Sequence, residues 1–484
     1  MKKILFVASE CVPFVKTGGL ADGVGTLPKT FDKSKFDVRV VLPSYTCIPW
    51  EYRSKFKYIS HFYMDLGYSK KSHHVGIMSM QHEGITYYFI DNEYYFSGCA
   101  PYGTMRFDIE KYCFFCKAAL SILPTVDFKP DIVHCHDWQA GLVPVFLKTM
   151  FQDNPFYWNI KAVMTIHNLK FQGIWDINTI KGITGLPEAV FTPDKLEYKK
   201  DASMLKGGLV YADYITTVSN TYAEEIQMPY YGEGLDGLLR ARNNSLCGIV
   251  NGIDYNEYNP ISDKKLFYNY SIQNFRNEKN KNKRALQAQL GLPVDDRKYM
   301  IAIISRLTDQ KGLDLIDWAM DSICDENTQI VIVGTGESQY ENMFKHYQWI
   351  MSDRVSANMY YSDDLAHKFY GAADALLMPS RFEPCGLTQL IALRYGTVPI
   401  VRETGGLKDT VKPYNEYEES GTGFTFSNYN ADELFATIDY SKKVFFENKE
   451  AWNNIAMRGM RLDYSWNRSA RVYEELYSRL TNYN

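Results

Sequence analysis

Met300-Ile301-Ala302-Ile303-Ile304-Ser305 is a short apolar run that ends at polar residues, and the expected fold follows from this pattern. A run of this length, rich in β-branched side chains, favours a strand that is buried on both faces. Amphipathic helical stretches alternate with similar runs from one end of the chain to the other. This alternation is typical of parallel sheets covered by helices, so the expected fold class is α/β with doubly wound sheets.

The other expected elements follow from the same pattern. The remaining strands are predicted at Lys3–Ala8, Val38–Leu42, Thr86–Ile90, Asp131–Cys135, Ala162–Ile166, Tyr214–Val218, Gln329–Val333, Ala375–Met378 and Val398–Val401. The predicted helices include Asp108–Leu123, Leu142–Met150, Arg284–Leu290, Leu365–Ala372, Leu387–Tyr395 and the amphipathic segment Trp466–Tyr483.

The strand–helix series runs twice. A polar stretch, residues 251–283, separates the two sets, and we place a hinge near residues 251–258. The expected domains are an N-terminal Rossmann-like domain over 1–252 and a second one over 253–460, facing one another across a cleft. The C-terminal helix, 461–484, is expected to pack back on the first domain. A chain of 484 residues is long enough for several domains of ordinary size.

Composition excludes several classes of protein. A content of 45% hydrophobic and 23% charged residues is that of a globular chain and excludes disordered and fibrous classes. The net charge of −4 argues against nucleic acid as a partner. No secretory leader and no apolar run long enough to span a bilayer are evident, so no membrane is expected. The nine cysteines lack disulfide-like spacing, which favours a reducing cytoplasm.

Ligands of open α/β sheets bind beyond the carboxyl ends of the strands, so the residues just past each strand are the candidates. Three glycine-bearing turns lie there, and backbone N–H groups that glycine leaves uncovered bind phosphate oxygens. Lys16, Arg306 and Lys311 supply the cations that a diphosphate needs. There is no Walker A motif and no three-glycine dinucleotide spacing. The phosphates therefore belong to a sugar nucleotide or a phosphorylated sugar.

The motifs in these positions resemble those of one enzyme family. They are KTGGLAD (16–22), HDW (136–138), TIHN (165–168), TTVS (216–219), NGID (251–254), SRLTDQKGLDL (305–315), PSRFEPCGLTQL (379–390) and TGGLKDTV (404–411). Their order and spacing resemble the motif series of bacterial glycogen synthases and plant starch synthases, and they span nearly the whole chain. The resemblance implies a GT-B fold and a retaining glucosyltransferase that extends an α-1,4-glucan from ADP-glucose, with no metal ion and no cofactor.

The resemblance also assigns the donor's phosphates to particular residues. Lys16 and the backbone of Gly18 and Gly19 would meet them from the first domain. Arg306 and Lys311 would hold the diphosphate from the second domain. Fixed cations stabilise the negative charge that grows on the departing ADP, which removes the need for a metal.

The sugar and the base are assigned in the same way. Glu383 would hydrogen-bond the glucose hydroxyls, and His167 would line the pocket near the anomeric carbon. Asp137 and Asn251 would bind sugar hydroxyls, and Tyr361 would stack on adenine. Retention is harder to explain, because a retaining glycosidase needs two carboxylates about 5 Å apart. Our hypothesis is front-face attack, with the departing phosphate accepting the proton of the acceptor.

The remaining expected substrate-binding residues are Asp22, Cys385, Thr388, Gly405 and Gly406, of which Thr388 and the two glycines would complete the phosphate and sugar pocket. Among all of these residues, the expected catalytic ones are Arg306, Lys311, Glu383 and His167.

Other features of the sequence have simpler interpretations. His134, His136 and Asp137 resemble a metal-binding triad, but no fourth ligand is evident, so no metal is expected. Gln139 stands where many relatives carry His, on the expected acceptor side. Ile391 stands where many other GT-B transferases carry a second Glu, which favours the synthase branch.

Two alternative functions remain open at this stage. The first is a GT-B transferase with another donor or acceptor, such as UDP-glucose or a small sugar. The second, from a different class, is a catalytically silent glucan-binding protein. Silence is disfavoured because the phosphate-binding lysines, Arg306 and Glu383 are all present.

Overall fold

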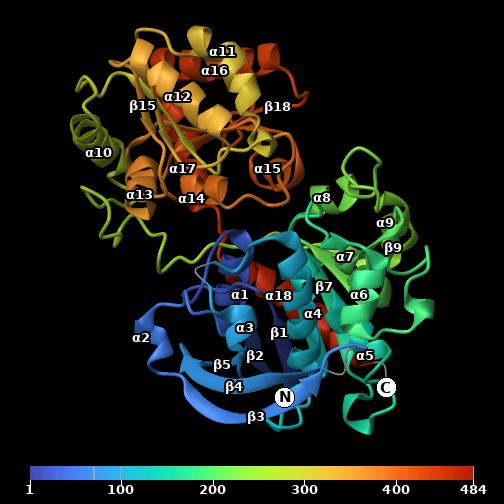
Figure 1. Cartoon of the computed structure of the whole chain (residues 1–484). Helices are drawn as coiled ribbons and strands as arrows, with labels where there is room; N and C mark the ends of the chain where they lie inside the picture. Colours follow the sequence, from blue (N-terminus) through green and yellow to red (C-terminus); the bar gives the residue numbers. More distant parts are fainter. Residues whose placement is uncertain (69–70, 99, 483–484) are drawn as a thin grey trace. The chain divides into compact units, whose positions relative to one another are not determined.

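The computed structural model of the chain describes residues 1–68, 71–98 and 100–482, and it divides into two compact units (Figure 1). Unit 1 comprises Met1–Val218, Ala223–Ile249 and Trp466–Asn484, and unit 2 comprises Ser219–Tyr222 and Val250–Ser465. The boundary between the units falls at Val250, whereas the predicted boundary is at residue 253. The short segment Ser219–Tyr222, which belongs to unit 2, has no counterpart in the expected division.

Unit 1 is built on a nine-stranded sheet with the order β12-β11-β7-β6-β1-β2-β5-β4-β3. Its first six strands in this order pair in parallel, as does β5 with β2, whereas β3, β4 and β5 pair antiparallel. The strands are β1 (Lys2–Val7), β2 (Phe36–Pro43), β3 (Lys57–Asp65), β4 (Ser72–His82), β5 (Ile85–Asp91), β6 (Ile132–His136), β7 (Lys161–Ile166), β11 (Tyr214–Thr217) and β12 (Leu246–Gly248). A small separate sheet contains β8 (Ile174–Trp175), β10 (Asp201–Ser203) and β9 (Glu197–Tyr198).

Different helices cover the two faces of this sheet, as strand β6 shows. His134 hydrogen-bonds to Tyr477 on one face, and the next residue, Cys135, lies near Cys116 on the other, because successive strand residues point to opposite faces. Tyr477 belongs to α18 (Trp466–Thr481), which packs on α1 (Gly19–Thr30). The expected end of the C-terminal helix, residues 483–484, lies outside the described residues. The other helices of unit 1 are α2 (Trp50–Arg53), α3 (Glu93–Phe96), α4 (Met105–Ser121), α5 (Leu142–Lys148), α6 (Ile177–Thr184), α7 (Met204–Tyr211), α8 (Asn220–Glu225, whose first turn belongs to unit 2) and α9 (Asp236–Ala241).

Unit 2 is built on a six-stranded sheet in which every pairing is parallel. Its order is β15 (Val355–Asn358), β14 (Thr328–Val333), β13 (Tyr299–Ile304), β16 (Ala375–Met378), β17 (Val398–Arg402) and β18 (Phe424–Phe426). Strand β13, which contains the apolar run that begins at Met300, lies inside this sheet and is buried almost throughout. The helices are α10 (Phe275–Leu290), α11 (Leu313–Ile323), α12 (Ser338–Ile350), α13 (Asp363–Ala372), α14 (Thr388–Arg394), α15 (Gly405–Thr410), α16 (Ala431–Glu447) and α17 (Lys449–Arg461).

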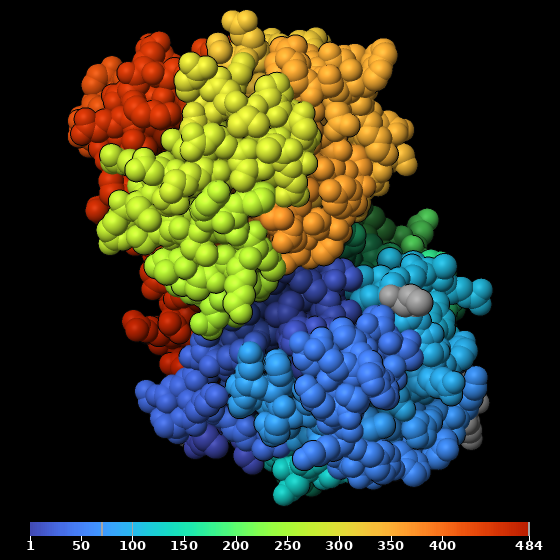
Figure 2. Space-filling model, turned by 90° about the vertical axis from the view of Figure 1, so that its left-hand side faces the viewer, coloured from blue at the N-terminus to red at the C-terminus, as the bar shows by residue number. Residues whose placement is uncertain are grey.

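The polar stretch 251–283 is not simply a linker. Helix α10 begins at Phe275, nine residues before the predicted start at Arg284, and packs on α13. Figure 2 shows residues of this segment, coloured yellow-green, on one face of unit 2 beside orange residues from later in the chain. The polar residues Lys279, Asn282 and Lys283 are buried on the inward side of α10, which is why its composition conceals a packed helix.

None of the described helices combines the length and the apolarity that crossing a membrane requires.

Candidate active site

In each of the two large sheets the strand order reverses at a topological switch point. Most of the expected site residues follow the strands that flank these switch points. In unit 1, β1 has β2 on one side and β6 on the other, so the chain order switches between β1 and β6. In unit 2 the corresponding switch lies between β13 and β16. The crevice beyond the carboxyl ends of strands at such a switch is where doubly wound sheets bind ligands.

A buried carboxylate anchors the loop after β1 through hydrogen bonds. Glu10 is 3% exposed and accepts hydrogen bonds from the backbone N–H of Thr17, from its hydroxyl (2.7 Å) and from the hydroxyl of Tyr102. Gly18 then caps α1, and a side chain built on it would meet nothing within 4 Å. The N-terminal backbone of α1 is therefore open to a ligand, and the positive end of a helix favours an anion there.

Lys16 lies at the same loop and is paired with another expected site residue. Its Nζ atom is 2.7 Å from Oδ1 of Asp22 in the first turn of α1. The side chain of Lys16 is 37% exposed, so this ion pair is solvated and weak. An anionic ligand could therefore compete for the ammonium at low cost.

Asp137 follows β6 in a strained backbone conformation, with φ 55° and ψ −173°. Its Oδ1 atom accepts hydrogen bonds from the backbone N–H of His167 (2.7 Å) and of Asn168 (3.4 Å). Burial raises the pKa of this carboxyl to about 7, because desolvation disfavours the charged form more than the two N–H groups stabilise it. A strained residue and a shifted carboxyl at a sheet's switch point are both typical of functional sites.

His167 follows β7 and contacts a second histidine, His136, through a 3.0 Å hydrogen bond between Nε2 and Nδ1. Behind them His134 stacks on His136, with ring centroids 4.3 Å apart. Desolvation lowers the pKa values of His134 and His167 to about 3 and that of His136 well below its usual range. All three imidazoles are therefore neutral at physiological pH. His167 can donate or accept a hydrogen bond, but it carries no charge.

In unit 2 the two switch-point strands place Lys311 and Glu383 together. The Nζ atom of Lys311 lies 2.6 Å from Oε2 of Glu383, and the hydroxyl of Ser380 donates to the same oxygen at 3.0 Å. The side chains are 15% and 7% exposed, so this ion pair is shielded from water far more than that of Lys16. Arg306, which directly follows the strand and one serine, is exposed and has no hydrogen-bond or ion-pair partner within the part of the chain that the structure describes.

Three glycines bring the loops of unit 2 into contact. A side-chain carbon at Gly312 would lie 2.0 Å from the carbonyl oxygen of Pro379, and one at Gly405 would lie 1.9 Å from that of Glu383. One at Gly406 would meet the carbonyl oxygen of Cys385 at 2.0 Å. Gly406 instead donates its backbone N–H to the carbonyl of Glu383 at 3.0 Å. Only glycine allows these backbones to approach so closely.

The remaining expected residues of unit 2 lie on the same loops or next to them. Cys385 is buried, and desolvation raises the pKa of its thiol to about 12, so it is no nucleophile. The backbone N–H of Asn251 hydrogen-bonds to that thiol. Thr388 begins α14, and Tyr361 is 78% exposed in the loop after β15. Most of the Tyr361 side chain therefore faces solvent.

The structure thus brings most of the predicted residues into two local groups, one in each unit. Sequence reasoning assigned no role in the site to three residues that organise these groups: Glu10, His136 and Ser380. Each lies at the end of a strand or within the next three residues, which was a usable signal. Gln139, the expected departure from relatives, is buried, and its Oε1 atom has no hydrogen-bond partner among the described residues.

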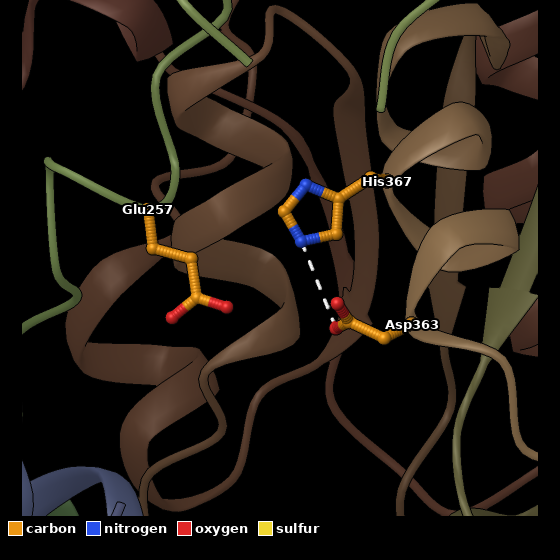
Figure 3. A group of neighbouring side chains, drawn as sticks. All are labelled: Glu257, Asp363 and His367. Atoms are coloured by element: carbon orange, nitrogen blue, oxygen red, sulfur yellow. Dashed lines mark ion pairs between the residues drawn. The ribbon is translucent and has the colours of Figure 1, made fainter. Parts of the chain in front are cut away.

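Among the described residues, one cluster has the composition of a metal site: Glu257, Asp363 and His367 (Figure 3). Lys265 is already inserted there, because its ammonium pairs with Asp363 and lies 3.3 Å from Nε2 of His367. The other imidazole nitrogen bonds to Asp263 at 2.7 Å. The charge of these carboxylates is met by lysine, and we assign no metal to them.

Two doubly wound units, each with phosphate-suited turns or cations at its switch point, define a glycosyltransferase of the GT-B class. Comparison with known families agrees: the starch synthase catalytic domain matches residues 3–241, and the glycosyl transferases group 1 domain matches residues 285–454. Glycogen synthase of Lachnospira eligens is 62% identical over 480 residues, covering 99% of this chain and 100% of the relative. The chain belongs to the glycogen synthase family.

More distant relatives extend the same picture. Glycogen synthase of Anoxybacillus flavithermus is 49% identical and covers 99% of this chain and 98% of its own length. The solved catalytic domain of starch synthase IV from Arabidopsis thaliana, bound to ADP and acarbose, superposes with a TM-score of 0.90 at 30% identity, with 99% of each chain covered. A sucrose-phosphate synthase from Thermosynechococcus elongatus, 17% identical with a TM-score of 0.64 over the whole of both chains, shares the fold.

Proposed function

We propose that this chain transfers glucose from ADP-glucose to the end of an α-1,4-glucan, with retention of the α configuration and release of ADP. Support comes from the glycogen synthases that it resembles over their full length and from the starch synthase bound to ADP and acarbose. In this proposal no metal ion and no cofactor takes part.

The observation that carries the proposal is the shielded pair of Lys311 and Glu383 at the switch point of unit 2. A carboxylate there hydrogen-bonds sugar hydroxyls, and an ammonium 2.6 Å away from it reaches the phosphate attached to the same sugar. Arg306, exposed on the neighbouring loop, adds the second positive charge. Together they stabilise the charge that develops on ADP as the bond to the anomeric carbon breaks.

Unit 1 supplies backbone N–H groups, one lysine and the contacts to the sugar in this proposal. The open backbone at Gly18 and the exposed Gly19, with Lys16 beside them, meet phosphate oxygens. His167 and Asp137, joined by the 2.7 Å hydrogen bond, meet the sugar. Tyr361 and Asn251 of unit 2 meet the adenine and a sugar hydroxyl. An uncharged imidazole beside the anomeric carbon suits a step in which the sugar itself becomes cation-like, because a charged one would repel it.

Retention by front-face attack fits the state of the two carboxyls. Glu383 is in unit 2 and is engaged by Lys311 and Ser380. Asp137 is in unit 1, and its pKa of about 7 leaves it largely protonated in mildly acidic solution. Glu383 is paired with Lys311, and Oδ1 of Asp137 accepts two backbone N–H groups, so both carboxyls are already engaged and poorly suited to act as nucleophiles. A glucosyl adduct trapped on either one with a slow substrate would contradict this mechanism.

The test is an ADP-release assay with ADP-glucose and glycogen, run on the wild type, Lys311→Ala and Glu383→Ala. Each substitution should lower turnover about a hundredfold or more, because it removes one fixed charge from the transition state. Lys368→Ala is the matched control: Lys368 is 16% exposed and pairs with Asp364 at 2.7 Å, and neither residue is assigned a part in transfer. Wild-type turnover in both site variants would defeat the site assignment.

A panel of donors and acceptors separates the alternatives. With glycogen as acceptor, turnover with ADP-glucose should exceed turnover with UDP-glucose. With ADP-glucose as donor, turnover with glycogen should exceed turnover with a small sugar. Preference for UDP-glucose or for a small sugar would make the chain a different GT-B transferase. Glycogen binding without transfer from any donor would make it a silent glucan-binding protein.

A further inference from the structure

His136, close to the proposed site, has a buried polar atom without a hydrogen-bond partner among the described residues. The side chain is 3% exposed, and its Nε2 atom has no hydrogen-bond partner among the described residues. Its Nδ1 atom lies 3.0 Å from Nε2 of His167. The proposed function assigns no part to His136, so the question is what this contact does to His167.

Because both imidazoles are neutral, each carries one ring proton, and the contact between them can form in two ways. In the first, His136 donates from Nδ1 and its Nε2 is a bare lone pair. In the second, His167 donates from Nε2, and His136 must then carry its proton on its own Nε2. That arrangement buries an N–H group with no acceptor.

The two arrangements differ in cost. A buried donor without an acceptor is the rarer defect in proteins, and an under-satisfied acceptor is tolerated more readily. The first arrangement is therefore favoured, and it has a consequence for His167. Since Nε2 of His167 accepts from His136, its single proton is on Nδ1.

Rotation of the His136 ring is hindered, because the ring stacks on that of His134. The ring of His134 lies 4.3 Å from it at an angle of 28°. His134 is itself held at both nitrogens, by the hydroxyl of Tyr477 at 2.6 Å and by that of Thr165 at 2.5 Å. Tyr477 comes from α18, so the C-terminal helix supports the histidine stack beneath the site.

We propose that His136 is a positioning residue that fixes His167 as the Nδ1–H tautomer, so that His167 presents a hydrogen-bond donor to an oxygen of the transferred sugar. The second half of this statement rests on the proposed function. The first half concerns the free protein and stands on the geometry of the two rings.

The first experiment measures the tautomer directly, without any sugar. Two-bond ¹H–¹⁵N correlation spectra of protein labelled with ring-¹⁵N histidine distinguish protonation at Nδ1 from protonation at Nε2, and His167→Gln assigns the signal. We expect His167 to be protonated at Nδ1 in the wild type. In His136→Asn the side-chain amide takes the place of Nδ1–H, so the tautomer should persist. In His136→Leu it should change to a mixture or to Nε2–H.

The second experiment asks whether the tautomer matters for transfer. His136→Leu should lower kcat roughly tenfold or more, because the donor is no longer aimed, with a smaller change in KM for ADP-glucose. His136→Asn should stay within about threefold of the wild type. His346→Leu, a change at an exposed histidine of α12, is the control and should behave as the wild type. If His136→Leu does not fold, His136→Gln replaces it, because its amide extends beyond the position of Nδ1.

Two results would overturn the inference: protonation of His167 at Nε2 in the wild type, or an unchanged tautomer and kcat in His136→Leu. Failure of the proposed function looks different, because a wild type that releases no ADP from ADP-glucose would still show the tautomer and its dependence on His136.

Discussion

The ammonium of Lys311 and the carboxylate of Glu383 share one hydrogen bond of 2.6 Å while both side chains are largely withdrawn from water. Each partner comes from a loop that follows a different strand of the same parallel sheet, β13 for the lysine and β16 for the glutamate. The pair therefore links the fold of unit 2 to its proposed chemistry, and the two roles can be separated by experiment.

We expect Lys311→Met to lower the free energy of unfolding by about 1–3 kcal/mol, because Glu383 is left as a shielded charge without its partner. Adding Glu383→Gln should restore much of that loss, since the amide carries no charge. Activity should not return, because the phosphate-binding cation is still missing. Urea unfolding of the two single variants and the double variant measures the coupling; stability effects that simply add would contradict it.

Gly312 and Gly291 form a matched pair for testing how closely the loops of unit 2 must approach. Both have left-handed backbones, with φ 70° and 72°. A side chain at Gly291 would meet nothing within 4 Å, whereas one at Gly312 would lie 2.0 Å from the carbonyl of Pro379. Gly291→Ala should therefore cost only about 1 kcal/mol of stability.

Gly312→Ala should cost about 3 kcal/mol or more, because the loop must move away from Pro379. Movement of that loop also displaces Lys311, so ADP release should fall in this variant and remain normal in Gly291→Ala. Equal unfolding midpoints for the two alanine variants in urea would show that the close contact at Gly312 does not matter.

The parallel strands could be predicted from the sequence because burial on both faces requires nearly continuous apolar residues. Strand β16 occupies the predicted residues Ala375–Met378, and β13 differs from its prediction by one residue at each end. Strand β3 was missed for the opposite reason. It lies at the sheet edge and is largely exposed, so it carries no apolar run.

The start of α10 was also beyond the reach of a pattern argument. Lys283 is buried, but its ammonium pairs with Asp374 at 2.6 Å, a partner ninety-one residues away in the sequence. The site shows the same limit. Position after a strand made Glu383 and His167 candidates, but the links of Glu383 to Lys311 and of His167 to His136 depend on which strands are neighbours in the sheet. Local sequence does not contain that information.

Arg306→Ala should separate function from folding more cleanly than the lysine variants do. Its side chain is exposed and makes no hydrogen bond or ion pair with the residues that the structure describes, so the unfolding midpoint should stay within experimental error of the wild type. Turnover with ADP-glucose and glycogen should fall about a hundredfold, because one charge that faces the departing diphosphate is lost. An undiminished rate would place Arg306 outside the site.

Asp137→Asn should make the protein more stable at neutral pH than the wild type, and the difference should depend on pH in a defined way. The pKa of Asp137 is raised to about 7 by burial, from 3.8. Between about pH 4 and pH 7 the unfolded carboxyl has lost its proton while the folded one keeps it. The folded state then binds more protons, so wild-type stability falls as the pH rises through this window.

Asparagine removes that dependence, because it has no proton to lose, and it can still accept from the N–H groups of His167 and Asn168. The two proteins should have equal stability near pH 4, and the variant should be ahead by on the order of 2–4 kcal/mol at pH 7 and above. Urea unfolding across this range measures the difference, in which all other titrating groups cancel. A stability difference that is constant over this pH range would mean that Asp137 is ionised in the folded protein over the whole range. A loss of activity in the stabilised variant would show that the buried carboxyl is retained for transfer rather than for folding.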